Sequence, residues 1–375
     1  MMDFRLEQLN SGADGAHVLV SWLGMRFSVS IDVDSPASPP SSSPTPSQRL
    51  YHLIRRLQDD ALTDDDYDTA SQALFSQILA AGEPLLRSIA RDRRPASSRL
   101  ADHLFPPIPL LRLGSSSSSA LEVTPSANAY FPSPLRHAHP GAHDLPFAVD
   151  PSLPAYRVDQ VLVLESLVHD PLAEHLACRV LLLPSPGEQL FCKAERGGIA
   201  FGDSVVGRDF RTMLDLRAAL LREAPATGGE IRVPALRGVL RHPEEGHVVG
   251  FLRDWVPGAS LAAREMAAVP AARRARWDAQ VASTLKGLHR LGCFWGAADK
   301  RSVIVDERGE DAWVVDFGGK VNLGLAREVG DREEGDWIDY DEVCRYLGTG
   351  DEEEGKEEGG SDHGSGDGKG GWYAC

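Results

Sequence analysis

The spacing of apolar residues predicts strands near the N-terminus and helices after them. Residues 4–9 and 18–33 alternate apolar and polar side chains on either side of a glycine-containing turn, as expected for strands of a small sheet. From residue 48 to residue 94 the apolar period becomes helical. Thr63 precedes three aspartates, which suits the N-cap and first turn of a helix. We therefore expect an N-terminal strand-and-helix extension over residues 1–94.

The rest of the chain divides into segments of different composition. Residues 34–47 are rich in proline and serine and predict a linker. Residues 95–150 include a run of five serines and predict a long irregular connector. Strand and helix patterns alternate over residues 151–348, which indicates a mixed α+β fold. Residues 349–375 are rich in Gly, Glu, Asp and Ser and predict a disordered acidic tail.

Composition narrows the classes of partner and compartment. The 375-residue chain has a net charge of −16, which argues against a nucleic-acid partner and against binding to an anionic membrane. Its five cysteines form no C-x-x-C pair and predict reduced thiols. The N-terminus lacks the pattern of a signal peptide, and no apolar run is long enough to span a bilayer. These features predict an intracellular protein, cytoplasmic or nuclear.

Candidate chemistry begins at Asp316, which follows an apolar strand predicted at residues 312–315 and precedes Phe317 and a glycine turn. A carboxylate at a strand end, followed by Phe-Gly, resembles the way protein kinases hold the Mg²⁺ that bridges the ATP phosphates. The loop before this strand, residues 288–302, closes a helix predicted at residues 277–290 and leads into a second apolar strand. The tripeptide therefore stands in a loop–strand–turn setting that is suited to a metal-dependent site.

The loop and the tripeptide together resemble the protein kinase superfamily, and they are similar to a group of fungal kinase-like proteins whose loop reads W-G-D-x-K-P-x-N. Trp295 and Gly296 match that pattern, but Ala297 stands where the catalytic Asp belongs. Ser302 stands in the place of the metal-binding Asn, and Asp299 replaces the Lys that faces the γ-phosphate. The resemblance therefore implies a degenerate catalytic loop.

A shift of the register does not restore the missing base. Making Asp299 the base would put Ile304 in the place of the metal-binding Asn and would break the match of the Trp-Gly pair. In the chosen register Ala297 lies 19 residues before Asp316, the separation that connects the loop to the metal-binding strand in this family. We therefore expect alanine at the base position.

The resemblance also implies a nucleotide site earlier in the chain. Lys193, on a predicted strand, would pair with the α- and β-phosphates. Asp209, near the start of a predicted helix, would pair with Lys193; complementing the helix dipole is the alternative reading. Backbone groups near Asp254 and Val256 would meet the edge of an adenine. The residues assigned to ATP are Lys193, Asp209, Asp254, Val256 and Ile304, and those assigned to Mg²⁺ are Asp316 and Ser302.

One further segment departs from the family pattern, and two further residues are interpreted as structural. Residues 165–174, where a glycine-rich phosphate lid belongs, contain no glycine. Asp336 precedes a helix predicted at residues 338–347 and reads as an N-cap, although an Asp at this place in the family braces the catalytic loop. His289 reads as a histidine packed at the end of a helix.

The sequence thus predicts an α+β, two-lobed protein-kinase-like fold, with lobes at residues 151–256 and 257–348. The expected function is a domain with an ATP/Mg-type nucleotide site that acts as a weak phosphotransferase or a pseudokinase. Loss of a general base costs about 10²–10⁴-fold in rate, so weak activity and no activity both stay open. One alternative is a small-molecule phosphotransferase of the aminoglycoside/choline type, since Gly296 matches the H-G-D loops of those enzymes. The other is a non-catalytic scaffold that binds a protein partner.

Overall fold

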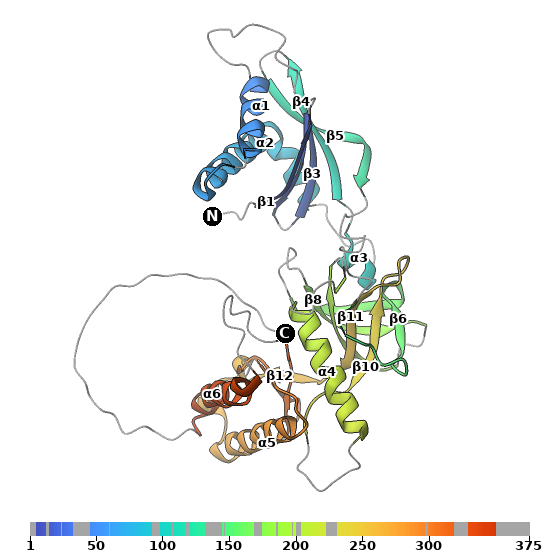
Figure 1. The fold of residues 1–375 in the computed structure, drawn as a ribbon, viewed down its shortest axis with the longest axis vertical. Helices are drawn as coiled ribbons and strands as arrows, with labels where there is room; N and C mark the ends of the chain where they lie inside the picture. The colour runs from blue at the N-terminus through green and yellow to red at the C-terminus, as the bar shows by residue number, and fades with distance from the viewer. Residues whose placement is uncertain are drawn as a thin grey trace, which may run out of the picture. The chain divides into compact units, whose positions relative to one another are not determined.

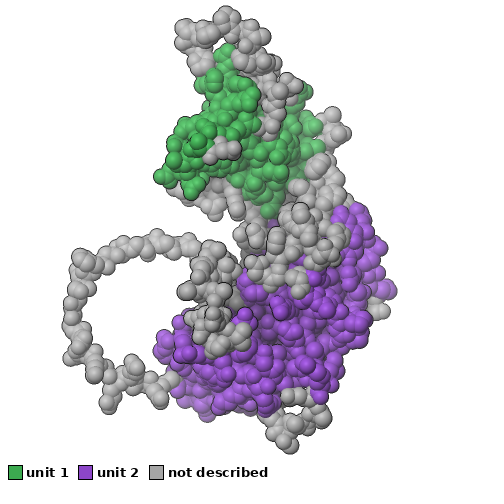
Figure 2. All heavy atoms as spheres, viewed as in Figure 1, with its two compact units in different colours: residues 1–97, 105–136, 170–173 green, residues 98–104, 137–169, 174–375 purple. Residues whose placement is uncertain are grey.

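The structure is a computed structural model, and its described residues form two compact units (Figure 2). Unit 1 groups residues 1–97, 105–136 and 170–173, and unit 2 groups residues 98–104, 137–169 and 174–375. The residues that the structure describes are 5–12, 15–23, 25–32, 46–59, 61–91, 98–106, 108–117, 120–131, 145, 147–168, 175–184, 187–196, 198–199, 204–222, 231–296, 299–318 and 329–349.

Unit 1 is a five-stranded sheet with two helices. Its elements are β1 (Arg5–Gly12), β2 (Gly15–Trp22), β3 (Met25–Asp32), α1 (Pro46–Leu57), α2 (Asp64–Arg91), β4 (Ile108–Ser117) and β5 (Ala120–Phe131). The strands follow the order β1-β2-β3-β4-β5 and are antiparallel, except that β3 and β4 are parallel. A parallel pair needs a crossover connection, and α1 and α2 lie within it. Both helices lie on one face of the sheet (Figure 1).

The core of unit 1 explains why these segments fold as they do. Alternate residues of β2 and β3, including Trp22 and Phe27, are buried together with Ile54 and Ile78 of the helices. Gly82 of α2 lies so close to Val123 of β5 that a Cβ atom would collide with it, so the helix and the sheet approach closely here. The Thr63 N-cap prediction is confirmed, because Thr63 Oγ1 accepts a hydrogen bond from Asp66 N at 3.2 Å.

The prediction of an irregular connector over residues 95–150 is wrong in its central part. This segment contains β4 and β5, which complete the sheet of unit 1, and the short helix α3 (Leu100–Leu104), which belongs to unit 2. Proline and serine in both strands weaken the sequence pattern, but Leu111 and Leu113 alternate toward the core and are fully buried. Residues 132–144 of the predicted connector, residues 34–45 of the predicted linker and nearly all of the acidic tail lie outside the described residues.

Unit 2 begins with a six-stranded sheet and one long helix. Its elements up to residue 254 are β6 (Ala155–Arg157), the 3₁₀ turn η2 (Val158–Gln160), β7 (Val161–Ser166), β8 (His175–Leu182), β9 (Leu190–Glu195), α4 (Val205–Arg222), β10 (Leu236–Arg241) and β11 (Val248–Asp254). The strand order is β6-β10-β11-β9-β8-β7. Phe210 of α4 stacks on Phe251 of β11 with ring centroids 5.4 Å apart, so the helix is fastened to the sheet by aromatic packing.

The second half of unit 2 is a small sheet with two helices. Its elements are β12 (Gly258–Ser260), the 3₁₀ turns η3 (Leu261–Ala263) and η4 (Met266–Ala268), α5 (Ala271–Arg290), β13 (Val303–Asp306), β14 (Ala312–Val314) and α6 (Val329–Leu347). The strands form an antiparallel sheet in the order β12-β13-β14. The helix predicted at residues 338–347 begins nine residues earlier, at Val329.

The chain is therefore α+β, as the sequence predicts, with sheets and helices in both units. The helix predicted to start near Asp209 corresponds to α4, and the helix predicted at residues 277–290 corresponds to the second part of α5. No helix in the described part of the chain combines the length and apolar character required to cross a membrane.

Candidate functional site

Lys193 lies within β9, where three distant segments of unit 2 meet. The residue is 1% exposed, and its Nζ donates to Asp209 Oδ2 at 2.9 Å and to Asp316 Oδ1 at 2.6 Å. Burying an ammonium group without anionic partners is costly, so the two carboxylates keep it charged. Burial alone lowers the pKa of Lys193, but the two carboxylates outweigh burial and raise the pKa above its ordinary value. We call Lys193, Asp209 and Asp316 the Lys193 cluster.

Asp316 follows β14 in a backbone conformation that is uncommon for a side chain of this kind. Its φ is 63°, in the left-handed region that usually favours glycine. Burial raises the pKa of Asp316, but the Lys193 ammonium outweighs burial, and Arg253 adds to the lowering. The carboxylate is therefore ionised at neutral pH. Its side chain is 18% exposed, so part of it remains open to a ligand.

Asp209 connects helix α4 to both other members of the cluster. Its Oδ2 accepts from Lys193, and its Oδ1 accepts from Phe317 N at 3.1 Å. The neighbouring Arg208 donates through Nε to Gly318 O, and a Cβ at Gly318 would come within 2.6 Å of Val205 O. Asp209 therefore forms an ion pair and does more than complement a helix dipole. Helix α4 also holds the backbone after Asp316 in place.

Asp336 braces the loop that follows α5. Its carboxylate accepts from Trp295 N at 2.8 Å, from Gly296 N at 2.7 Å, and pairs with His289 Nε2 at 2.9 Å. Asp336 is 2% exposed and lies inside α6. The N-cap reading of Asp336 is therefore wrong, because α6 begins at Val329 and the side chain turns inward to the loop. His289 is a packed histidine at the end of its helix, and it also belongs to this network.

The loop is also tied to the segment that carries Asp316. Trp295 is fully buried, and its Nε1 donates to Val315 O at 2.9 Å. Val315 N in turn donates to Ser302 O at 2.9 Å, so the residue before Asp316 is held on both of its backbone groups. Ser302, expected as a metal ligand, is 2% exposed and adjoins this segment through its backbone. The geometry of Asp316 is thus set by the loop as well as by α4.

The position expected to carry the catalytic base is not described. Ala297 lies outside the described residues, as do residues 169–174 of the segment 165–174 where the phosphate lid belongs. Asp299 is described, and its carboxylate accepts from Arg301 N at 2.8 Å and from Arg301 Nη2 at 3.1 Å. Arg301 therefore compensates the negative charge that the sequence places at the position of the family's phosphate-facing lysine.

The residues expected to meet an adenine do not belong to the Lys193 cluster. Asp254 ends β11, and its backbone N–H donates to Ala235 O at 3.0 Å while its carbonyl accepts from Arg253 Nη1 at 3.1 Å. Val256 follows and is 6% exposed. Ile304 lies on β13, opposite Trp313 of β14, and is partly buried. The backbone groups of Asp254 are therefore already used within the chain.

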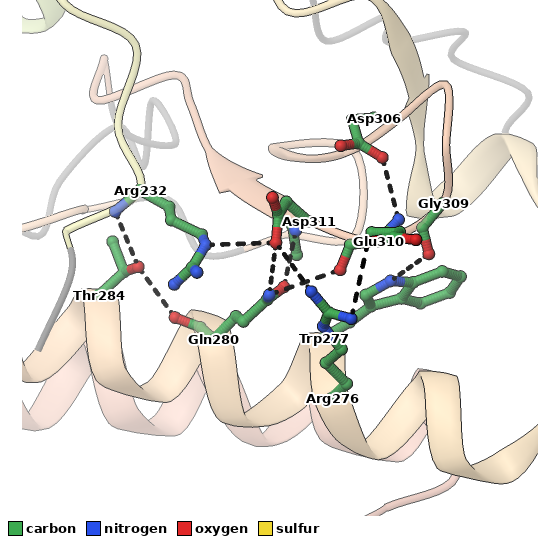
Figure 3. A network of polar contacts seen from close by, with 10 residues as sticks. Arg232, Arg276, Trp277, Gln280, Thr284, Asp306, Gly309, Glu310 and Asp311 are labelled. Carbon is green, nitrogen blue, oxygen red and sulfur yellow. Dashed lines mark hydrogen bonds and ion pairs between the residues drawn. The ribbon is translucent and has the colours of Figure 1, made fainter.

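A polar network fastens the β13–β14 hairpin to α5 (Figure 3). Gln280 donates to Asp311 Oδ1 at 2.8 Å and accepts from Ala312 N at 2.8 Å. Thr284 of the same helix accepts from Arg232 N at 3.2 Å, and Arg232 pairs with Asp311 at 3.7 Å. Asp316 lies two residues after the end of β14, so this network fixes the start of the strand that leads to its carboxylate.

Three residues near the Lys193 cluster were not predicted from the sequence: His175, Phe191 and Arg253. The strand period gave a signal for Phe191 alone, since Phe191 and Lys193 are two positions apart and share one face of β9. Arg253 stood out only as a charged residue within the apolar run of β11. The cross-strand register that makes them neighbours cannot be obtained from either segment alone.

His175, at the start of β8, gives unit 2 a predicted pH dependence. Burial and the charge of Lys193 lower the pKa of His175 to about 4, while Asp316 acts in the opposite direction and Arg196 adds to the lowering. In an unfolded chain the pKa of histidine is about 6.5, so the unfolded state takes up the proton first as pH falls. The free energy of unfolding should therefore fall by roughly 1–3 kcal/mol between pH 6.5 and pH 4 because of this residue.

Urea denaturation of wild type and His175→Gln at pH 7.5 and pH 4.5 measures this effect. The variant should lose less stability than wild type on acidification, because glutamine takes up no proton. His52→Gln, at an exposed position of α1, is the control and should behave as wild type. Equal loss of stability in wild type and His175→Gln would contradict the assignment.

The described residues offer limited means to hold a metal ion. No group of three or more His, Cys, Asp or Glu side chains converges as a metal site in the described part of the chain. Asp316 is an ionised, partly exposed carboxylate, and Mg²⁺ is commonly held by one or two carboxylates together with substrate phosphates and water. This donor set fits one Mg²⁺ that arrives with a phosphate ligand.

Comparison with known proteins gives no family for this chain. A scan against models of protein families finds no match, and a search of curated proteins finds none either.

Proposed function

We propose that unit 2 is a protein-kinase-like domain with an ATP/Mg-type site and a degenerate catalytic loop, acting as a weak phosphotransferase or a pseudokinase. One observation carries the proposal: the Lys193 ammonium lies between Asp209 and Asp316, and Lys193 and Asp316 are 123 residues apart in the chain. A lysine that pairs with a helix carboxylate, close to a carboxylate suited to Mg²⁺, is the arrangement that phosphoryl-transfer sites of this class require.

The order of elements supports the same proposal. A mostly antiparallel sheet with helix α4 is followed by α5, a braced loop, a hairpin and α6. The loop held by Asp336 lies between α5 and the hairpin that leads to Asp316. This sequence of parts brings a lysine, a carboxylate suited to Mg²⁺ and a hydrogen-bonded loop into one unit, which supports a role in positioning a phosphate chain.

Mg²⁺ and the protein would have different roles in binding a nucleotide phosphate chain. Asp316 would hold the ion, with the Ser302 hydroxyl as the weaker candidate ligand, and the ion would neutralise phosphate charge. Lys193 would contact phosphate oxygens once Asp316 engages the metal. Residue 297 is alanine and cannot accept a proton, and Asp299 is paired with Arg301. Phosphate transfer to a hydroxyl would then lack a general base, a loss of about 10²–10⁴-fold.

A thermal-shift series with Mg-ATP tests the site. Ligand at 100 times its Kd stabilises a protein by about 2.7 kcal/mol, so unit 2 should melt several degrees higher. Asp316→Asn should remove the shift, and Asp215→Asn, at an exposed position of α4, should keep it. A flat response of the folded wild type would favour the scaffold alternative. Transfer of γ-phosphate at ordinary kinase rates, lost in Asp316→Ala, would contradict the degenerate loop.

A further inference from the structure

The strand face that carries Lys193 also carries a bulky pair of side chains. Residues two apart on a strand share a face, so Phe191 lies beside Lys193 on β9. In the antiparallel register between β9 and β11, Phe251 is opposite Lys193 and Arg253 is opposite Phe191. Cross-strand partners on one face touch, so Phe191 and Arg253 form a pair next to the Lys193 cluster.

The Arg253 side chain lies flat against the phenyl ring. Its Cζ is 3.7 Å from the centroid of the Phe191 ring, and Arg253 and Phe191 are 4% and 3% exposed. A guanidinium group stacked on an aromatic ring is attracted to the face of the ring, and more strongly so away from water. The Nη1 of Arg253 also donates to Asp254 O at 3.1 Å. Removing Arg253 from this position would sacrifice both interactions.

This pair lies at the end of β11, where the proposed site would place a base. The proposed site brings an adenine edge to the backbone at Asp254, but the carbonyl of Asp254 already accepts from Arg253 and its N–H donates to Ala235 O. A flat base beside this strand end would have to displace a buried guanidinium from its stack on Phe191. Carbonyl groups can accept twice, so the stacked side chains are the larger obstacle.

At the phosphate end of the site, the described residues leave part of the Asp316 carboxylate uncovered. Lys193 holds its charge within 2.6 Å of that carboxylate. Arg253 also lies near enough to Asp316 to lower the pKa of its carboxyl group. Lys193 and Arg253 are thus two cations beside the two carboxylates in the described part of the site. Adding Mg²⁺ makes the site net positive, which suits a chain of phosphates.

We propose that this site binds the Mg²⁺-bound phosphate chain of its ligand and not a purine base, because Arg253 and Phe191 close the place of the base. This inference rests on the proposed function, and it specifies the ligand class as a di- or triphosphate group with no requirement for adenine. The Arg253–Phe191 pair is then the specificity determinant of the site.

Calorimetric titration of the full chain with Mg-ATP, Mg-GTP, Mg-tripolyphosphate and adenosine tests the proposal without a variant. The three triphosphates should bind wild type with Kd values within about threefold of each other, and adenosine should not bind. Wild type that binds Mg-ATP ten times more tightly than Mg-tripolyphosphate, or that binds adenosine, would overturn the inference and leave the proposed function intact. If none of the triphosphates binds, the phosphate site itself fails, and the proposed function fails with it.

Two variants sharpen the test. Arg253→Ala should tighten Mg-ATP binding at least tenfold relative to Mg-tripolyphosphate. The substitution removes the guanidinium group beside Asp254, so an adenine can bind there. Arg253→Met keeps much of the volume and the packing on Phe191, so it should leave the two ligands equal. Arg241→Ala, on the neighbouring strand β10, is the control and should match wild type; its side chain bonds Gly246 O. An unchanged ratio in folded Arg253→Ala would count against closure by Arg253.

Discussion

Replacing Lys193 with methionine is expected to lower the free energy of unfolding of unit 2 by about 3–5 kcal/mol, the usual cost of removing one partner of a buried ion pair. Methionine fills much of the same volume, so packing is largely kept. The loss arises because the carboxylates of Asp209 and Asp316 stay in the protein interior without their common cation. Tripolyphosphate binding should disappear in the same variant.

Urea denaturation followed by tryptophan fluorescence measures the loss, since five of the seven tryptophans lie in the described part of unit 2 and report on its unfolding: Trp255, Trp277, Trp295, Trp313 and Trp337. Lys286→Met, at an exposed position of α5, is the matched control and should change the stability by less than about 0.5 kcal/mol. Adding Asp209→Asn to Lys193→Met should restore part of the stability by removing one unpaired charge. A Lys193→Met midpoint equal to that of wild type would show that the cluster is not buried and paired as described.

The second large effect is expected at Asp336. Asp336→Asn keeps the shape of the side chain but replaces one acceptor oxygen with an NH₂ group, which then faces the N–H of Trp295 or Gly296. Hydrogen bonds to a charged group contribute about 1.5–3 kcal/mol each, and a buried donor left without a partner adds to the loss. We expect unit 2 to lose about 2–4 kcal/mol.

Hydrogen exchange identifies the cause of that loss. The amides of Trp295 and Gly296 should exchange faster in Asp336→Asn, because both donate to this carboxylate in wild type. Asp341→Asn, at an exposed position of the same helix, is the control and should preserve their protection. Unchanged exchange at these two amides, in a destabilised variant, would assign the loss to other contacts of α6.

The Lys193 cluster also determines how strongly the site can bind a metal ion. The negative charge of Asp316 is balanced by the ammonium group of Lys193, 2.6 Å away. A Mg²⁺ ion must therefore compete with this ammonium group for the carboxylate. A ligand that brings phosphates can replace Asp316 as a partner of Lys193 at the same time. The metal and the phosphate ligand should therefore bind together, and Mg²⁺ alone should bind weakly.

The sequence by itself determined the local elements and the chemical identity of the cluster. Apolar periods predicted the helices that became α4 and α5, because a periodic stripe must be buried wherever the helix packs. The strand-end carboxylate at Asp316 and the apolar strand around Lys193 depend on neighbouring residues only, so both were visible in the sequence.

Only the tertiary structure decided which of these residues touch. It added β4 and β5 to the first sheet, where pairing with β3 outweighs weak local strand signals. It showed that Asp336, expected as a helix cap, instead accepts hydrogen bonds from a loop 40 residues earlier in the chain. It also stacked Arg253 on Phe191 through the register of β9 and β11. Strand register and long-range hydrogen bonds are set by how elements pack together, and that information is spread over the whole chain.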